Sequence, residues 1–335
     1  MEPLLELVDL RVSARTGRTD LEIVHGIDLA VPAGQTVAVV GESGSGKSLT
    51  MLAVMGLLAE PLHVSGGAVR LGGRELTGLP ERDLRAIRGN DLAMIYQDPM
   101  TSLNPLMRVG DQVIEAMTAH GVAKPKARQR MLDLLARVGI PDPVRTAKAY
   151  PHEFSGGMRQ RIMIACALAM RPRLLIADEP TTALDVTIQQ QILALVDELR
   201  QEFGMTTIWV THDLGVVARL VDRVVVMYAG TVVEDAPVRQ AFAAPQHPYT
   251  HALLAALPDP TDDERPPLAQ IPGRPPGSTE QVEGCAFRPR CAQAVEACTT
   301  RPALQPRLDG RAACWVPPQE WRSGAAGVRS RTGGG

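Results

Sequence analysis

The stretch from Gly41 to Ser48 reads GESGSGKS and matches the phosphate-binding loop pattern GxxxxGK[ST]. A β-branched run at residues 35–40 precedes it and an apolar run at 49–58 follows it, which predicts a strand, the loop and then a helix. Glycines let successive N–H groups curve around an anion, and the helix N-terminus adds positive potential. The sequence therefore predicts a nucleoside triphosphate site. Its residues are Gly41, Glu42, Ser43, Gly44, Ser45, Gly46, Lys47 and Ser48.

Bulk properties indicate a protein of about two domains, since the chain has 335 residues and 45% of them are hydrophobic. A net charge of −2 argues against a nucleic-acid binder that uses its whole surface. No apolar run approaches the roughly 18–20 residues that span a bilayer, and the N-terminus lacks the basic start of a signal peptide. We expect a cytoplasmic location, in which the five cysteines are thiols or metal ligands rather than disulfides.

A second nucleotide motif lies at residues 174–179, LLIADE, an apolar strand that ends in two carboxylates. Such a strand can deliver Asp178 to the magnesium ion of the loop, where Ser48 is a further ligand. Glu179 is then placed to polarise an attacking water. A strand that merely ends in solvated acids is the structural alternative, and the upstream loop makes it unattractive.

Between these motifs, Ser155, Gly156 and Gly157 open a predicted helix in FSGGMRQR and form another anion-binding helix start, although an ordinary helix cap has the same residues. With this segment the chain resembles the ATP-binding cassette of ABC transporters, over residues 1–240. Gln97 in MIYQDP resembles the glutamine of the Q-loop. Asp185 closes PTTALD, which resembles the D-loop from Pro180 onward, and His212 in VTHD resembles the switch histidine. Residues 28–34 resemble the usual lead-in to the loop strand.

The resemblance implies an α/β fold of the P-loop NTPase class, with a RecA-like core, an antiparallel β subdomain and a helical subdomain at about 83–170. It implies that two cassettes face each other head to tail, with each ATP between one P-loop and the serine and glycines of the other. Lys47, Glu179 and His212 are the implied catalytic residues, with ATP and Mg²⁺ as cofactors. The implied magnesium ligands are Ser48, Gln97 and Asp178, and the implied ATP contacts beyond the P-loop are Gln97, Ser155, Gly156, Gly157, Asp178 and Asp185.

The chain departs from the family pattern at three points. Met158 and Phe154 replace a common glutamine and leucine beside the serine and glycines, which they leave intact. The family usually stacks adenine on an aromatic residue upstream of the P-loop, whereas the first aromatic residue here is Tyr96. Arg11 or Arg15 could stack its guanidinium plane on the base instead, or the pocket is aliphatic.

The runs DEPTTALDVTIQQQIL and QHPYTHALLAALP, with the cysteine-bearing tail, resemble bacterial dipeptide and oligopeptide importers. This branch includes nickel and glutathione importers. The resemblance implies two separate permeases, docked around Gln97 and the helical insert at the cytoplasmic face of the inner membrane. It also implies a paralogous second cassette and an extracytoplasmic binding protein. A non-transport ATPase that acts on nucleic acid or ribosomes is the rival class, and we expect no nucleic-acid partner because the chain has one cassette and no heptad array.

Four of the five cysteines follow the Pro-rich stretch with the spacing C-x₅-C-x₆-C-x₁₅-C. Four thiolates suit an iron–sulfur cluster or zinc, and the lack of C-x₂-C pairs favours [4Fe–4S]; ordinary reduced thiols are the structural alternative. Cys166 is expected in the core. The expected organisation is a cassette at 1–240, a linker at 241–283, a four-cysteine extension at 284–318 and a disordered tail at 319–335. The predicted ligands are Cys285, Cys291, Cys298 and Cys314.

Overall fold

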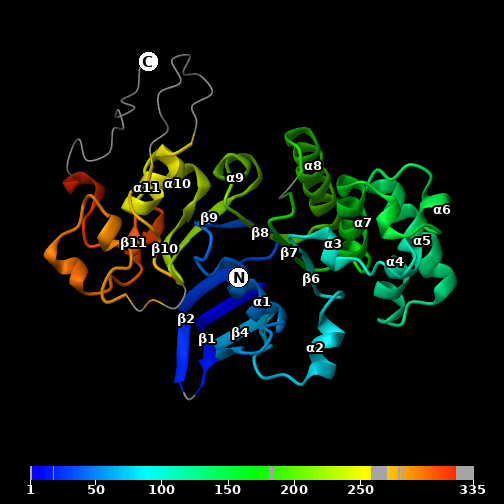
Figure 1. The fold of residues 1–335 in the computed structure, drawn as a ribbon, viewed down its shortest axis with the longest axis horizontal. Coiled ribbons are helices and arrows are strands. Elements are labelled where there is room, and N and C mark those ends of the chain that lie inside the picture. The colour runs from blue at the N-terminus through cyan, green and yellow to red at the C-terminus, as the bar shows by residue number, and fades with distance from the viewer. Residues whose placement is uncertain are drawn as a thin grey trace, which may run out of the picture.

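The computed structural model describes residues 2–17, 19–181, 184–257, 270–277, 280 and 282–321. Their strands form two sheets, one four-stranded and one eight-stranded. The first has the order β2-β1-β4-β5 and pairs its strands antiparallel. Figure 1 shows it below the larger sheet. Its strands are β1 Leu5–Thr16, β2 Thr19–Val31, β4 Leu62–Leu71 and β5 Arg74–Glu75.

The larger sheet has the order β11-β12-β10-β9-β3-β8-β7-β6. Pairing is parallel from β9 to β6 and antiparallel from β9 outward to β11. Buried, mainly apolar runs form its centre, as expected of parallel strands covered on both faces. Its strands are β3 Thr36–Val40, β6 Leu92–Ile95, β7 Leu174–Asp178, β8 Thr206–Thr211, β9 Arg223–Tyr228, β10 Thr231–Pro237, β11 Gln305–Arg307 and β12 Gly310–Ala312.

The helices gather mainly beside and above the larger sheet, and Figure 1 shows α4 to α7 as a separate group at one end of the molecule. Short 3₁₀ turns at residues 151–153, 288–290, 296–299 and 318–320 complete the described elements. The helices are α1 Lys47–Met55, α2 Glu81–Ile87, α3 Pro99–Ser102, α4 Val109–Thr118, α5 Lys124–Arg137, α6 Pro143–Thr146, α7 Gly156–Leu168, α8 Val186–Phe203, α9 Leu214–Leu220, α10 Val238–Ala243 and α11 Pro248–Ala255.

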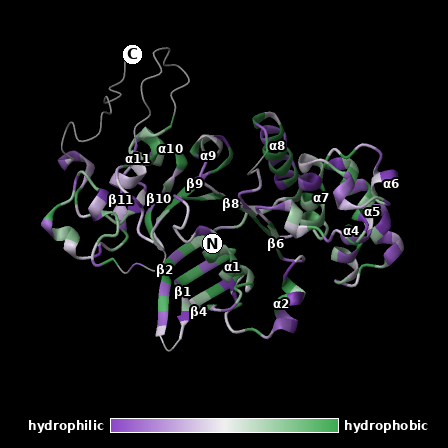
Figure 2. Ribbon diagram, viewed as in Figure 1, coloured by the Kyte–Doolittle hydropathy of each residue, from purple (hydrophilic) through white to green (hydrophobic). Residues whose placement is uncertain are grey.

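Two hydrophobic cores lie on opposite faces of the larger sheet, because successive side chains of a strand point to opposite faces. In β3, Ala38 and Val40 join the core that includes α4 to α8, whereas Val37 and Val39 join the core shared with β1, β2 and α1. Figure 2 shows hydrophilic and hydrophobic residues alternating along β1 and β2, as expected of a sheet with one buried face. The resulting α/β architecture agrees with the predicted class: a parallel core, an antiparallel sheet and a helical group.

The cysteine-bearing segment is joined to the larger sheet by β12, which pairs with β10. Buried Asp235 of β10 binds both Arg223 and Arg311. Residues 241–257, which the sequence placed in a linker, contain the end of α10 and all of α11. Residues 258–269 of that linker and 322–335 of the expected tail lie outside the described residues, so the division into domains stays a proposal.

Candidate functional site

The GESGSGKS segment forms the turn between β3 and α1, as predicted. Gly44 and Gly46 have φ angles of 79° and 96°, a region that favours glycine. A Cβ atom at Gly41 would lie 2.2 Å from the carbonyl oxygen of Met227 on the neighbouring strand β9. The glycines therefore allow a tight loop that opens onto the N-terminus of α1, an arrangement suited to phosphate.

Lys47 begins α1 and is buried. Its Nζ donates to the carbonyl oxygens of Gly41, at 2.8 Å, and Glu42, at 3.0 Å. Burial lowers the pKa of Lys47, and the carboxylates of Glu179, Asp178 and Glu42 act in the opposite direction. The ammonium group thus lies inside the loop and close to three acids.

Asp178 ends the buried strand β7 beside the second helical residue of α1. Ser48 Oγ donates to Asp178 Oδ1 at 3.0 Å. Burial raises the pKa of Asp178, while the Ser48 hydrogen bond acts to lower it. Hydroxyl and carboxylate oxygens are ligands that Mg²⁺ prefers, so this pair could hold the magnesium ion of a nucleotide.

Glu179 brings together two other predicted residues. Gln97 Nε2 donates to Glu179 Oε2 at 2.9 Å, and His212 Nδ1 lies 3.1 Å from Glu179 Oε1. The backbone of Glu179 has a φ of 45°, an uncommon value for a non-glycine residue, and its N–H donates to the carbonyl of Val210 in β8. Such backbone strain gathers at functional sites. The ends of β6, β7 and β8 thus bring Gln97 and His212 together at the carboxylate of Glu179.

Ser155 and Asp185 occupy helix N-caps rather than the P-loop. Ser155 Oγ accepts from the N–H of Met158 at 3.4 Å at the start of α7, and Asp185 accepts from Ile188 at 2.9 Å at the start of α8. Ser155 and Gly156 are exposed. Figure 1 shows α7 in the helical group, apart from α1, so one chain does not place the two motifs together. Thr182 and Ala183 of PTTALD lie outside the described residues.

The two arginines that could stack on adenine differ in their ion pairing. Arg11 forms ion pairs with Asp9 at 2.8 Å and Glu22 at 3.1 Å. Arg15 keeps 69% of its side chain exposed and lies 3.8 Å from Asp20. Arg15 is therefore the freer of the two to stack on a base.

All four C-terminal cysteines line one cavity of about 10 Å³, together with His247, Phe287 and Trp315. Burial raises the pKa of Cys285, that of Cys291 to about 12 and that of Cys314 to about 11. Within the described ranges, however, no three His, Cys, Asp or Glu side chains form a group that could hold a metal ion. The four cysteines thus line one cavity, but the described side chains are not arranged as a metal-binding group. Cys166 packs against the core from α7, as expected.

Two residues that contact the P-loop were not anticipated. The N–H of Glu42 donates to Tyr249 Oη at 2.8 Å, and the Arg290 guanidinium binds the Glu42 carboxylate. Both lie beyond residue 240, where the sequence shows no nucleotide motif. The only signal in the sequence is their place in the stretch that resembles peptide importers. Tyr249 lies in QHPYTHALLAALP, and Arg290 directly precedes Cys291.

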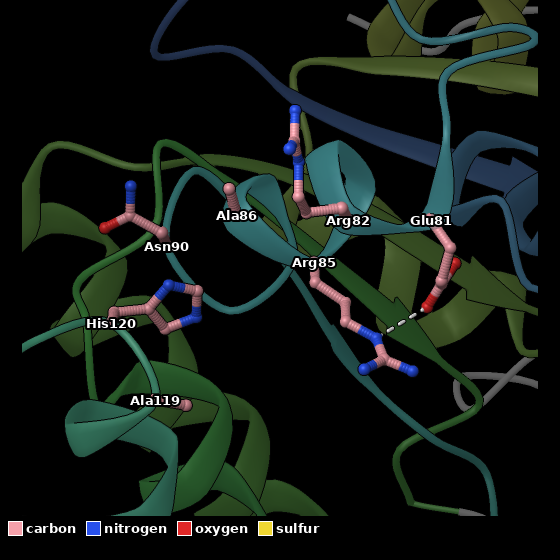
Figure 3. Close-up of a pocket in the computed structure, with 7 residues that line it drawn as sticks. All are labelled: Glu81, Arg82, Arg85, Ala86, Asn90, Ala119 and His120. Atoms are coloured by element: carbon pink, nitrogen blue, oxygen red, sulfur yellow. Dashed lines mark hydrogen bonds and ion pairs between the residues drawn. The ribbon is translucent and has the colours of Figure 1, made fainter.

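A hollow of about 690 Å³ lies away from the P-loop, between α2 and the end of α4. Figure 3 shows Arg82 and Arg85 extending from α2 on one side, with His120 and Asn90 on the other. Arg85 binds Glu81 at 3.0 Å. The hollow is polar and charged, unlike the usual apolar pocket for a small molecule.

Comparison with known proteins yields two family matches. The profile described as ABC transporter matches residues 24–182, and the profile described as oligopeptide/dipeptide transporter, C-terminal region, matches residues 233–298. The second match covers α11, three of the cysteines and Arg290.

Curated relatives match along nearly the whole chain. The oligopeptide transport ATP-binding protein OppD of Salmonella typhimurium is 49% identical over 319 residues, 95% of each chain. The dipeptide transport ATP-binding protein DppD of Escherichia coli is 48% identical over 310 residues, 92% of this chain and 94% of the other. Among solved structures, the dimeric post-hydrolysis state of the ATP-binding cassette MJ0796 bound to ADP and Pi has a TM-score of 0.62 and 29% identity. It covers 70% of this chain and 99% of its own.

Proposed function

This chain belongs to the ABC transporter family, and from that premise we propose that it is the ATP-hydrolysing subunit of a bacterial importer of di- and oligopeptides. The relatives named for oligopeptide and dipeptide transport support the substrate class. The convergence of Gln97 and His212 on Glu179 supports hydrolysis. Nickel, glutathione or another small solute is the alternative cargo, since the permeases and binding protein select it.

In the proposed reaction the P-loop N–H groups and Lys47 hold the phosphates of ATP. Ser48 and Asp178 would hold a magnesium ion, which would supply positive charge to neutralise the transferring phosphate. Glu179 accepts a proton from the attacking water, and Gln97 and His212 orient its two oxygens. The hydrogen bonds seen on both oxygens support this positioning role.

We propose that a second, paralogous cassette supplies Ser155, Gly156 and Gly157 to the ATP held by this P-loop. The exposure of Ser155 and Gly156 at a helix N-terminus supports this arrangement, because such an end attracts phosphate. Membrane permeases are the other partners, and an extracytoplasmic binding protein delivers the cargo. Every helix in the described part of the chain is too short or too polar to cross a bilayer. The proposed location is peripheral, at the cytoplasmic face of the inner membrane.

The hollow beside α2 is the proposed docking site for a cytoplasmic helix of a permease. It lies on elements that flank Gln97 in the chain, α2 before it and α4 after it. The segment after Gln97 also exposes Met100 and Leu106, at 62% and 86%. A helix with acidic side chains would complement Arg82 and Arg85. Because α2 and α4 flank Gln97 in the chain, docking there would be transmitted to the Q-loop.

Charge reversal at this hollow tests the transport function. Arg85→Glu should reduce copurification with the permeases and ATP-dependent uptake of labelled peptides by about tenfold, because like charges then face each other. Arg239→Glu, an equal change at an exposed position of α10 outside the helical group, should leave both unchanged. Uptake by the Arg85→Glu complex at the wild-type rate would argue against this docking site. A wild-type complex that moves no peptide would argue against the substrate class.

We further propose that the four C-terminal cysteines bind a metal centre that fastens this segment. The convergence of four soft thiols on one enclosed cavity supports it, since these ligands suit iron–sulfur clusters and zinc. The sequence spacing favours [4Fe–4S], and zinc is the alternative that four thiolates also suit. The protein's part is to position the thiols, and because burial keeps them protonated, metal uptake would release their protons.

Anaerobic purification distinguishes the two centres. A [4Fe–4S] centre should give a brown protein with several irons per chain, and Cys291→Ser should bleach it and lower the melting temperature. Cys166→Ser, which changes a core cysteine outside the cavity, should keep the colour. A colourless protein with one zinc per chain would show that the centre is zinc and not an iron–sulfur cluster. A metal-free protein would refute both.

A further inference from the structure

The carboxylate of Glu42, the second residue of the P-loop, binds an arginine from the far end of the chain. Arg290 Nη1 donates to Glu42 Oε2 at 2.6 Å and Arg290 Nη2 to Oε1 at 3.0 Å, across 248 residues of sequence. The Arg290 side chain is 4% exposed and that of Glu42 is 27% exposed. This is a two-bond, charge-assisted pair, the strongest geometry available to these side chains.

The remaining polar groups of Glu42 are also held. Its carbonyl accepts from Lys47 Nζ at 3.0 Å, and its N–H donates to Tyr249 Oη at 2.8 Å. Glu42 is therefore fixed from within the loop by Lys47 and from outside by two residues of the C-terminal segment. The loop conformation depends on both.

Arg290 is itself held in place before it reaches Glu42. Its Nε donates to the carbonyl of Pro272 at 2.9 Å, and Nη1 also lies 3.3 Å from Tyr228 Oη. The guanidinium carbon lies 5.8 Å from the ring centroid of Tyr228 and 6.0 Å from that of Phe287. Rings of Tyr228, Tyr249 and Phe287 pack together at 4.6 to 5.3 Å. A cation held so rigidly needs little reorganisation to meet the carboxylate.

The pair also sets the charge of the loop. Burial lowers the pKa of Lys47, and the Glu42 carboxylate is one of three acids that act against this lowering, so it acts electrostatically on the loop lysine. Without a counter-cation that carboxylate would oppose the approach of a triphosphate. Arg290 compensates the negative charge of Glu42, so Lys47 and the N–H groups of the P-loop can attract the phosphates.

We propose that Arg290 is a positioning residue for ATP binding, which makes the C-terminal segment part of the nucleotide site. Arg290 orients Glu42 and neutralises its charge, and it touches neither ATP nor the attacking water. The inference rests on the proposed binding of ATP by the P-loop. It predicts an effect on ATP affinity and KM, with little effect on kcat.

The test uses the full-length chain with Mg²⁺ and measures displacement of a fluorescent ATP analogue by ATP. Arg290→Gln should weaken ATP binding by roughly tenfold or more, the usual effect of losing a hydrogen bond to a charged group. Arg274→Gln removes the same charge from an exposed position of the same segment and should bind ATP as the wild type does. In the assembled transporter, Arg290→Gln should raise the KM for ATP and change kcat by less than about threefold.

A double variant separates charge compensation from a merely structural role. Glu42→Gln combined with Arg290→Gln removes both charges and should recover most of the lost affinity. Should Arg290→Gln fail to fold, Arg290→Lys keeps the cation without the two-bond geometry and should bind ATP with intermediate affinity. Wild-type affinity in Arg290→Gln, no recovery in the double variant, or full affinity in Arg290→Lys would overturn the inference. A wild-type chain that binds no ATP would instead refute the proposed function.

Discussion

Glu179→Gln is expected to lower steady-state ATP hydrolysis by the assembled transporter by about 10²–10⁴-fold, the usual contribution of a general base. The amide that replaces the carboxylate cannot take the proton from water. It has nearly the same shape, so the neighbouring Gln97 and His212 stay in place. ATP binding should therefore persist, and the two cassettes should remain closed on unhydrolysed nucleotide.

Phosphate release and nucleotide retention should be measured on the same preparation. Glu198→Gln, an equal change at an exposed position of α8, is the matched control and should hydrolyse ATP at the wild-type rate. Hydrolysis by Glu179→Gln within a few-fold of the wild type would show that another group activates the water.

Lys47→Ala is expected to weaken ATP binding by roughly 10- to 150-fold, or about 1.5–3 kcal/mol for hydrogen bonds to a charged group. Lys47 is buried between two loop carbonyls and three acids, so its loss removes the cation best placed to meet the phosphates. The change thus acts on binding, whereas Glu179→Gln acts on turnover.

Equilibrium binding of ATP by the full-length variant measures this effect, with a thermal melt to check that the loop still folds. Lys126→Ala removes an exposed lysine of α5 and should bind ATP normally. Equal affinity in the Lys47→Ala and Lys126→Ala proteins would contradict the role given to the P-loop.

The local parts of the site could be predicted from sequence because each depends on a few adjacent residues. The glycines of residues 41–46 predict the loop conformation, and the apolar run of β7 predicts a buried strand that ends at Asp178. The helix start at Ser155 is likewise indicated by its capping side chain, whereas the cap at Asp185 was not predicted and is seen only in the structure.

Sheet order explains the part of the site that no local pattern contains. Gln97 follows β6, Glu179 follows β7 and His212 follows β8, and these strands are neighbours in the sheet although other elements separate them in sequence. The carboxyl ends of parallel strands meet at one edge, so the three side chains converge. Resemblance to a family placed them in one site, but only the register of the strands shows that they meet on Glu179.

The C-terminal contacts could not be predicted for a different reason. Strands β11 and β12 have three residues each, too few to show an alternating pattern, and α11 lies in a stretch whose composition resembles the start of a linker. Arg290 lies in a segment that the pairing of β12 with β10 attaches to the larger sheet. A single arginine in a Pro-rich stretch gives no local sign of a partner 248 residues away.

That separation has a consequence for how the protein is made. Glu42 leaves the ribosome 248 residues ahead of Arg290, so at about 5–20 residues per second roughly 12–50 s pass before its counter-cation exists. On the role proposed for Arg290, the Glu42 carboxylate of the nascent P-loop is uncompensated during this interval, and weaker ATP binding is expected. Full affinity for ATP is then expected only when synthesis is almost complete. A prematurely terminated chain would bind ATP weakly and would compete poorly for the permeases.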